Sequence, residues 1–273
     1  HQGYIEPHNT TAFWNSDGQL NLWTSTQGSF QVRGTVASIL RLPVSQVKVT
    51  PMEIGGGFGG KITAYLDAIC AVLSKKTGAP VKVSMSRTDV LEASGPTSGS
   101  MMKLKMGVTN EGKITAGQIE LNFEAGGFPG SPVGGAAQCL FSPYDIANLR
   151  VDGYDVVDNK PKSTAYRAPG APIGAFAVES MIDEICEKLS IDRLEFRIMN
   201  AAKEGTRRVN GVGNPPIGAI ETQEAAKNHD HWSTPLEGAN RGRGVATGFW
   251  MNGAGAACAT ANVNYDGTVN LII

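Results

Sequence analysis

Residues 55–61, Gly-Gly-Gly-Phe-Gly-Gly-Lys, decide how the rest of this sequence is interpreted. The alternating apolar residues of 47–54 predict a β-strand before this segment, and the apolar spacing of 62–77 predicts a helix after it, ended by Gly78. Residues 81–86 predict a further strand. Glycines leave backbone amides uncovered by side chains and let a ligand come close. The order of strand, glycine-rich segment and helix therefore predicts a ligand-binding loop between the strand and the helix.

The glycine-rich segment matches two nucleotide-binding patterns, each incompletely. Gly55, Gly57 and Gly60 form a GxGxxG pattern, but the acid expected near the end of the second strand is missing, since Asp89 lies beyond it. The GxxxxGK pattern of a phosphate-binding loop is followed by Ile62 instead of Ser or Thr, which argues against a nucleoside triphosphatase. A nicotinamide-linked Rossmann dehydrogenase and a non-catalytic structural fragment therefore stay open as alternatives.

The composition is that of a folded chain with little net charge. Of the 273 residues 41% are hydrophobic, enough to build a core, and 12% are glycine by the count of 34, which indicates many turns. The formal net charge of −1 argues against binding of nucleic acid or a membrane surface through charge. No apolar run is long enough to span a bilayer.

The cysteines and histidines offer no strong metal motif. No CxxC pair is present, so a zinc knuckle or an iron–sulfur site within the chain is not expected. Cys70 and Cys186 fall on apolar helical stripes, which predicts buried, reduced thiols and a cytoplasmic location. The sequence His229-Asp230-His231 could bind a metal, but in a polar segment a surface turn is the favoured interpretation.

Turn residues and apolar periodicity place the other elements. Three hairpins are expected, with turns at Asp17-Gly18, Asn110–Gly112 and Asp266-Gly267. Helices are expected at 31–42, 177–189, 191–200 and 221–227, a strand at 243–251, and a loop that lines a site at 124–138.

These elements predict an α+β fold with mixed sheets and packed helices. We expect one domain at 1–205, a linker at 206–217 rich in Gly, Pro and Asn, and the truncated start of a second domain at 218–273. The last predicted strand has no turn after it, which suggests that the chain is a fragment.

Residues 163–172, Ser-Thr-Ala-Tyr-Arg-Ala-Pro-Gly-Ala-Pro, form the second conspicuous segment. Arg167 is followed by two prolines and a glycine, which stiffen the chain before the next helix. A guanidinium group on a stiff loop is held in one position, where it can donate hydrogen bonds to an anion or an oxo group.

Together these segments resemble the molybdenum-binding subunit of the xanthine dehydrogenase and aldehyde oxidase family, the molybdenum hydroxylases. The resemblance covers nearly the whole chain and identifies it as an internal fragment with the molybdenum-cofactor-binding fold of this family. It rests on Ile5-Glu6-Pro7, Ser25–Gln27, 55–61, the YRxxG pattern of 166–170 and the amphipathic helix that precedes Met199-Asn200.

The resemblance implies a set of cofactor-binding residues but no catalytic residue. Gln27 would hydrogen-bond an apical ligand of molybdenum, Phe58 would approach the metal through its backbone, and Arg167 would lie against the metal's oxygen ligands. The cofactor-binding set is Gln27, Gly56, Gly57, Phe58, Gly59, Ala165 and Arg167. The general-base Glu of the family is expected beyond Ile273.

The resemblance also implies the chemistry. Family enzymes hydroxylate an aldehyde or a ring carbon next to nitrogen, take the oxygen from water, and pass electrons to Fe–S clusters and FAD on partner domains or subunits. The implied cofactor is a molybdenum-pterin, expected in the molybdopterin cytosine dinucleotide form. Other implied partners are the remainder of the molybdenum subunit and a small-molecule substrate, and the fragment alone is expected to be inactive.

Three positions depart from the purine-oxidising members of this family. Ile62, Gly135 and Pro169 stand where those members carry a Glu, an Arg and an aromatic residue. Xanthine is therefore not the expected substrate. The Cys of the carbon monoxide dehydrogenase branch is also missing from 168–172, which leaves an aldehyde or another N-heterocycle.

Overall fold

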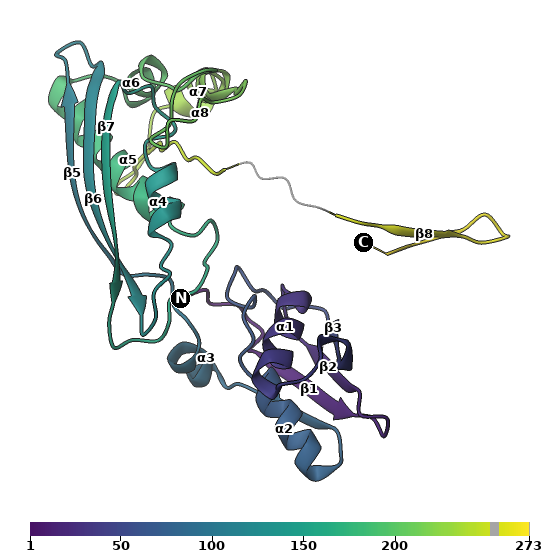
Figure 1. Ribbon diagram of the computed structural model, residues 1–273. Coiled ribbons are helices and arrows are strands. Elements are labelled where there is room, and N and C mark those ends of the chain that lie inside the picture. Colours follow the sequence, from purple (N-terminus) through teal and green to yellow (C-terminus); the bar gives the residue numbers. More distant parts are fainter. Residues whose placement is uncertain (252–256, 273) are drawn as a thin grey trace.

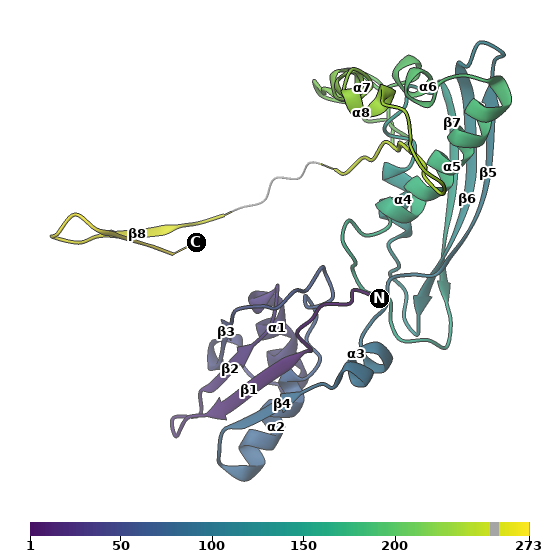
Figure 2. The same ribbon diagram turned by 180° about the vertical axis from the view of Figure 1, so that it is seen from behind.

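The computed structural model describes residues 1–251 and 257–272, so Ile273, the end of the last predicted strand, lies outside the described residues. The chain forms two mixed sheets, each packed against helices, with the N-terminal residues running between them (Figures 1 and 2). This arrangement confirms the predicted α+β class. Residues 1–205 contain both hydrophobic cores.

The first sheet has the strand order β3-β2-β1-β4. Its strands β1 and β2 form the antiparallel hairpin predicted at Asp17-Gly18, where Gly18 has a φ of +84°. Strand β3 runs parallel to β2, and β4 runs antiparallel to β1. The four strands are β1 (Asn9–Trp14), β2 (Leu20–Thr24), β3 (Val47–Pro51) and β4 (Val81–Ser84).

Helices α1 (Ser29–Leu40) and α2 (Asp67–Thr77) close the core of this sheet. The sequence prediction for the second of these helices was wrong in its start and in its face. The predicted helix began at Ile62, but residues 62–66 are irregular, and three of its apolar side chains are exposed: Ile69, Val72 and Leu73. The buried face carries Asp67, Cys70, Ala71 and Ser74 instead.

The first sheet lacks the unit on which the dinucleotide-binding alternative depends. In a Rossmann unit the two strands that flank the glycine turn and its helix lie next to each other or nearly so, with the helix beginning at the turn. Here β3 and β4 lie at opposite edges with β2 and β1 between them, and several irregular residues separate Gly60 from α2. The GxGxxG match therefore lacks its structural context.

The second sheet has the order β5-β6-β7, with β5 antiparallel and β7 parallel to β6. Helices α4 and α5 pack against it around a core that includes Leu121, Phe141 and Ile182 (Figure 1). The elements are β5 (Ser100–Val108), β6 (Ile114–Gly126), α4 (Val133–Cys139), β7 (Asn148–Val157) and α5 (Ala171–Leu189).

Two helices in this half differ from the sequence predictions. Residues 124–138 were expected to be a loop, yet α4 begins within them, because Ala136 and Cys139 are buried against the sheet. Helix α5 begins at Ala171 rather than 177, with Pro172 in its first turn, where a missing N–H costs nothing.

The remaining elements connect or follow the two sheets. Helix α3 lies between them in sequence, and the hairpin of β8 and β9 has the predicted Asp266-Gly267 turn. Residues 243–251, predicted as a strand, form no strand, because no described strand pairs with them. The elements outside the two sheets and their packed helices are the 3₁₀-helix Val44–Gln46, α3 (Arg87–Ala93), α6 (Arg193–Met199), α7 (Ala219–Lys227), α8 (Asp230–Ser233), β8 (Thr260–Val263) and β9 (Val269–Ile272). Among the described residues, no helix combines the length and apolarity needed to cross a bilayer.

Candidate functional site

The glycine-rich loop at 55–61 brings together the three segments that the sequence singled out. The backbone N–H of Gly59 donates to Gln27 Oε1 over 2.8 Å, and the N–H of Lys61 reaches the same oxygen over 3.4 Å. From the other side, the N–H of Arg167 donates to the carbonyl of Phe58 over 2.9 Å. Hydrogen bonds thus connect the segment after β2, the loop after β3 and the loop before α5 at one site.

Close backbone contacts explain why this loop needs glycine. A Cβ on Gly57 would come within 2.5 Å of Gln27 Oε1, and one on Gly59 within 2.6 Å of the Ala165 carbonyl. Gly59 also has a φ of +97°, and Phe58 adopts a positive φ of 50°, which is unfavourable for a bulky side chain. Such strained backbone persists where surrounding structure fixes it and is concentrated at functional sites.

The loop leaves polar groups available for a ligand. Within the described residues, the N–H groups of Gly56, Gly57 and Phe58 donate to no protein acceptor. The side chains of Gln27, Phe58 and Arg167 are exposed beside them. Consecutive free amides next to an amide and a guanidinium group suit a ligand with anionic or oxo groups.

A cavity of about 440 Å³ is bordered by Gly59 of this loop and by Ala165 of the segment before α5. The Ala165 carbonyl accepts a hydrogen bond from Gln2 Nε2 over 2.9 Å, and the same amide donates to Thr164 Oγ1 over 3.1 Å. The cavity is lined by Gly59, Ile62, Thr63, Tyr65, Ala93, Gly95, Gly130, Pro161, Lys162, Ser163, Thr164 and Ala165. It offers space for an organic ligand next to the candidate cofactor-binding residues.

A buried polar cluster lies under the glycine-rich loop, and sequence reasoning did not assign it a role. Lys61 Nζ lies 2.8 Å from Glu6 Oε2 and 2.9 Å from Ser25 Oγ, and 4.8 Å from the centroid of the Tyr4 ring. The Tyr4 hydroxyl is 2.7 Å from His8 Nε2. The signal in the sequence is the pair of motif residues Glu6 and Lys61, which served only to indicate the family.

Two pKa values in this cluster are strongly shifted. Burial by itself raises the pKa of Glu6, but hydrogen bonds from Lys61, Ser25, Gly55 and Asn9 outweigh it and lower the pKa to about 2. Burial, with the charge of Lys61 nearby, lowers the pKa of His8 to about 4 against the opposing effect of Glu6. At neutral pH the cluster therefore contains an ionised Glu6 and an uncharged His8.

Of the three positions that depart from the purine-oxidising pattern, Gly135 and Pro169 lie against each other. A Cβ on Gly135 would lie 2.5 Å from the Pro169 carbonyl, so the backbone here has no room for the side chain of an Arg. Ile62 lines the cavity next to the loop.

Other candidate metal or ligand groups lie elsewhere. His229 Nδ1 accepts a hydrogen bond from the His231 N–H over 3.0 Å and so caps α8, in agreement with the surface-turn interpretation. No cluster of three or more His, Cys, Asp and Glu residues suited to a metal occurs in the part of the chain that the structure describes. The cysteines are free thiols, buried at 70, 139 and 186 and exposed at 258.

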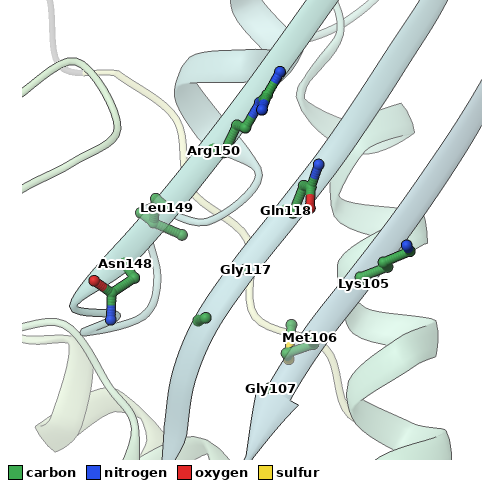
Figure 3. Close-up of a pocket in the computed structure, with 9 residues that line it drawn as sticks. Lys105, Met106, Gly107, Gly117, Gln118, Asn148, Leu149 and Arg150 are labelled. Carbon is green, nitrogen blue, oxygen red and sulfur yellow. The ribbon is translucent and has the colours of Figure 1, made fainter.

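A hollow of about 400 Å³ lies over strands β5, β6 and β7 (Figure 3). Lys105, Gln118 and Arg150 are register partners on the three strands, and Figure 3 shows their side chains extending from these strands. Arg150 is paired with Asp152 over 2.8 Å. None of the candidate cofactor-binding residues lines this hollow.

The family assignment follows from comparison with known proteins. The family model described as "Molybdopterin cofactor-binding domain" matches residues 1–201. The chain belongs to this family, in the group of molybdenum-binding subunits of xanthine dehydrogenases and aldehyde oxidoreductases.

Particular relatives support the same assignment. The chain is 33% identical to the nicotinate dehydrogenase large molybdopterin subunit of Eubacterium barkeri over 82% of this chain and 54% of that protein. It is 37% identical to the molybdenum-binding subunit of an aldehyde oxidoreductase of Escherichia coli K12 over 72% of this chain and 26% of that protein. The chain thus spans about a quarter to a half of these relatives.

Solved structures show the same fold. The aldehyde oxidoreductase of Desulfovibrio gigas matches with a TM-score of 0.86 at 25% identity, over 98% of this chain and 31% of that chain. The Cu,Mo-CO dehydrogenase matches with a TM-score of 0.70 at 26% identity, over 85% of this chain and 31% of that chain.

Proposed function

We propose that this chain supplies the cofactor-binding part of a molybdenum hydroxylase, with Gln27, Gly56–Gly59, Ala165 and Arg167 holding a molybdenum-pterin. The observation that carries the proposal is the convergence of Gln27 and Arg167 on one strained glycine-rich loop, through hydrogen bonds of 2.8 and 2.9 Å. The family assignment supplies the identity of the ligand.

The residues present fit such a cofactor. A side chain is excluded at Gly57 and Gly59 by contacts under 3 Å, and the N–H groups of Gly56, Gly57 and Phe58 donate to no protein acceptor among the described residues. In the proposal the Gln27 amide group and the Arg167 guanidinium donate hydrogen bonds to oxygen atoms around the metal, and Phe58 contributes its backbone. When bound, the cofactor supplies the redox chemistry that adds a water-derived oxygen atom to the substrate carbon and removes two electrons.

In this proposal no residue of the chain acts as the general base. The carboxylate of Glu6 is in contact with the loop, but a pKa of about 2 and an ion pair with Lys61 make it a poor proton acceptor at neutral pH. We place the base Glu outside these 273 residues, so the isolated chain is expected not to turn over.

The proposed substrate is an aldehyde or an N-heterocycle other than a purine. The names of the relatives include an aldehyde oxidoreductase and a nicotinate dehydrogenase. The tight contact between Gly135 and Pro169 and the apolar Ile62 leave the purine-binding side chains without counterparts.

The remaining parts of the proposal concern the whole enzyme. Electrons would leave through Fe–S clusters to FAD on partner domains or subunits, and the pterin would carry a cytosine dinucleotide. A cytoplasmic location fits the free thiols at Cys70, Cys139 and Cys186.

The test is the metal and pterin content of the purified full-length protein. We expect molybdenum and a fluorescent oxidised pterin in near-stoichiometric amounts, with CMP released on hydrolysis. Gln27→Ala and Arg167→Ala should lower the molybdenum content several-fold, whereas Gln31→Ala, an exposed position on α1, should not. A protein that lacks molybdenum but melts higher with NAD would favour a dehydrogenase, and one that responds to neither would favour a structural role.

A further inference from the structure

One carboxylate oxygen accepts hydrogen bonds from both ends of the glycine-rich loop. Glu6 Oε2 accepts a hydrogen bond from the Gly55 N–H over 2.7 Å, at the start of the loop, and one from Lys61 Nζ over 2.8 Å, at its end. The same oxygen accepts the Ser25 hydroxyl over 2.7 Å, two residues before Gln27. A single side chain thus joins the N-terminal segment, the end of β2 and the loop.

Lys61 is the fully buried member of this arrangement. Its side chain has no solvent exposure, and its ammonium group contacts Glu6, Ser25 and the face of the Tyr4 ring. A buried ammonium ion is very costly unless paired, so these contacts fix where the side chain and its backbone lie. The Lys61 carbonyl in turn accepts the Gln27 N–H over 2.9 Å and the Thr26 hydroxyl over 3.0 Å.

The loop itself has little else to hold it. Glycine loses more conformational freedom on ordering than any other residue, and the four glycines within 55–59 contribute no side-chain contacts. Its middle is held by three hydrogen bonds: Gly59 N–H to Gln27 Oε1, Arg167 N–H to the Phe58 carbonyl, and Gly60 N–H to the Gly57 carbonyl. Its ends are held by Glu6 and Lys61.

We infer that Glu6 and Lys61 are positioning residues, an ion pair that fixes the glycine-rich loop in its cofactor-binding shape before the cofactor binds. The inference rests on the proposed function of the loop. A loop that is already ordered loses no conformational entropy when the cofactor binds. Loss of the ion pair is therefore expected to weaken retention of the cofactor more than it weakens the fold.

The experiment compares variants of the full-length protein. Lys61→Met keeps the length of the side chain and removes its charge; Glu6→Leu combined with Lys61→Met replaces the pair by apolar groups, a change that often leaves stability nearly intact. Glu6→Gln retains an acceptor for the Gly55 N–H but leaves the buried Lys61 without a countercharge, so it isolates the contribution of the charge. Asp67→Asn is the matched control, since Asp67 is buried in the same half and accepts from Thr10 Oγ1 over 2.9 Å without contacting the loop.

Four readouts separate positioning from general destabilisation: molybdenum per polypeptide, melting temperature, hydrogen exchange of residues 55–61, and the Mo(V) electron paramagnetic resonance spectrum. We expect Lys61→Met and the double variant to lose at least five-fold in molybdenum content, to exchange at least ten-fold faster in the loop than wild type, and to alter the spectrum of any bound metal. Exchange in β1 and β2 should stay unchanged in the double variant. Glu6→Gln should lose molybdenum as Lys61→Met does, and Asp67→Asn should retain all of it.

The inference is overturned if the double variant binds molybdenum and exchanges as wild type does, or if its molybdenum content falls only in proportion to its melting temperature. A wild-type protein without molybdenum or pterin contradicts the proposed function instead. In that case hydrogen exchange at 55–61 still decides whether the ion pair orders the loop, because that measurement needs no cofactor.

Discussion

The backbone N–H of Arg167 donates a hydrogen bond to the carbonyl of Phe58, with 2.9 Å between the two atoms. This bond joins the loop of the first sheet to the loop that follows the second sheet. The side chains of both residues are exposed. Ala168, next to Arg167, has a positive φ of 57°, and Phe58 has one of 50°. The candidate site therefore depends on both halves of the fold, although each half has its own core.

Gly59→Ala should disrupt this junction. At a φ of +97° and with the Ala165 carbonyl 2.6 Å from the new Cβ, the backbone must move, and we expect a loss of about 2 kcal/mol or more in the free energy of unfolding. Molybdenum content of the full-length protein should fall together with stability. Denaturant unfolding and metal analysis check the two effects.

Gly34→Ala is the control for Gly59→Ala. Gly34 lies in α1 and is exposed, and a Cβ added there would meet no heavy atom within 4 Å, so helix propensity should stabilise the variant by about 0.5–1 kcal/mol. Equal behaviour of the two variants would contradict the close approach of the two loops.

The sequence predicted the hairpins well because their turns are local. Asp17-Gly18 and Asp266-Gly267 lie where a positive φ is required, at Gly18 and Gly267, and no tertiary contact is needed to specify them. The glycine-rich loop was recognised for a similar reason. Its close contacts with Gln27 and Ala165, however, come from distant parts of the chain, and only the resemblance to a family indicated them.

Periodicity failed where polar residues are buried. In α2 the buried face includes Asp67, which accepts from Thr10 Oγ1, so the apolar stripe through Ile69 and Leu73 pointed to the wrong side. The ion pair of Glu6 and Lys61 was missed because a buried charge is predicted only once its partner is known. Residues 243–251 have the alternation of a strand but no partner strand among the described residues.

Arg197→Met should destabilise the second half strongly. The Arg197 side chain is fully buried, with Nε 2.9 Å from Glu179 Oε2 and Nη2 2.9 Å from Asp183 Oδ1. Its removal leaves the Glu179 carboxylate buried beside Tyr144 without a countercharge, so we expect a loss of about 3–5 kcal/mol in the free energy of unfolding. Lys227→Met breaks an exposed pair with Glu195 and should leave the melting temperature nearly unchanged. Comparable losses in both variants would show that the buried position of Arg197 gives it no special part in stabilising this half.

Under the proposed function, the full-length protein should prefer aldehydes or N-heterocycles other than purines to xanthine. Ile62 offers no carboxylate, and the contact of Gly135 with the Pro169 carbonyl excludes a side chain there. Steady-state kinetics on a panel of the three substrate classes should give xanthine the lowest kcat/KM. Gly135→Arg should not raise xanthine oxidation and should lower the melting temperature. A kcat/KM for xanthine equal to that for the best aldehyde would contradict the proposed substrate class.

The stability of the protein should fall between pH 6.5 and 4 because of His8. Its pKa is about 4 in the folded chain, chiefly through burial, against about 6.5 when unfolded, so the unfolded state binds more protons in this range and stability rises with pH. The full effect is worth about 3 kcal/mol, lost as the pH falls from 6.5 to 4 and constant below that. His8→Gln keeps a hydrogen-bonding partner for the Tyr4 hydroxyl and removes the titration, so its free energy of unfolding should vary less over this range. Chemical denaturation of both proteins at half-unit steps of pH measures the difference, and parallel curves would assign the acid sensitivity to other groups.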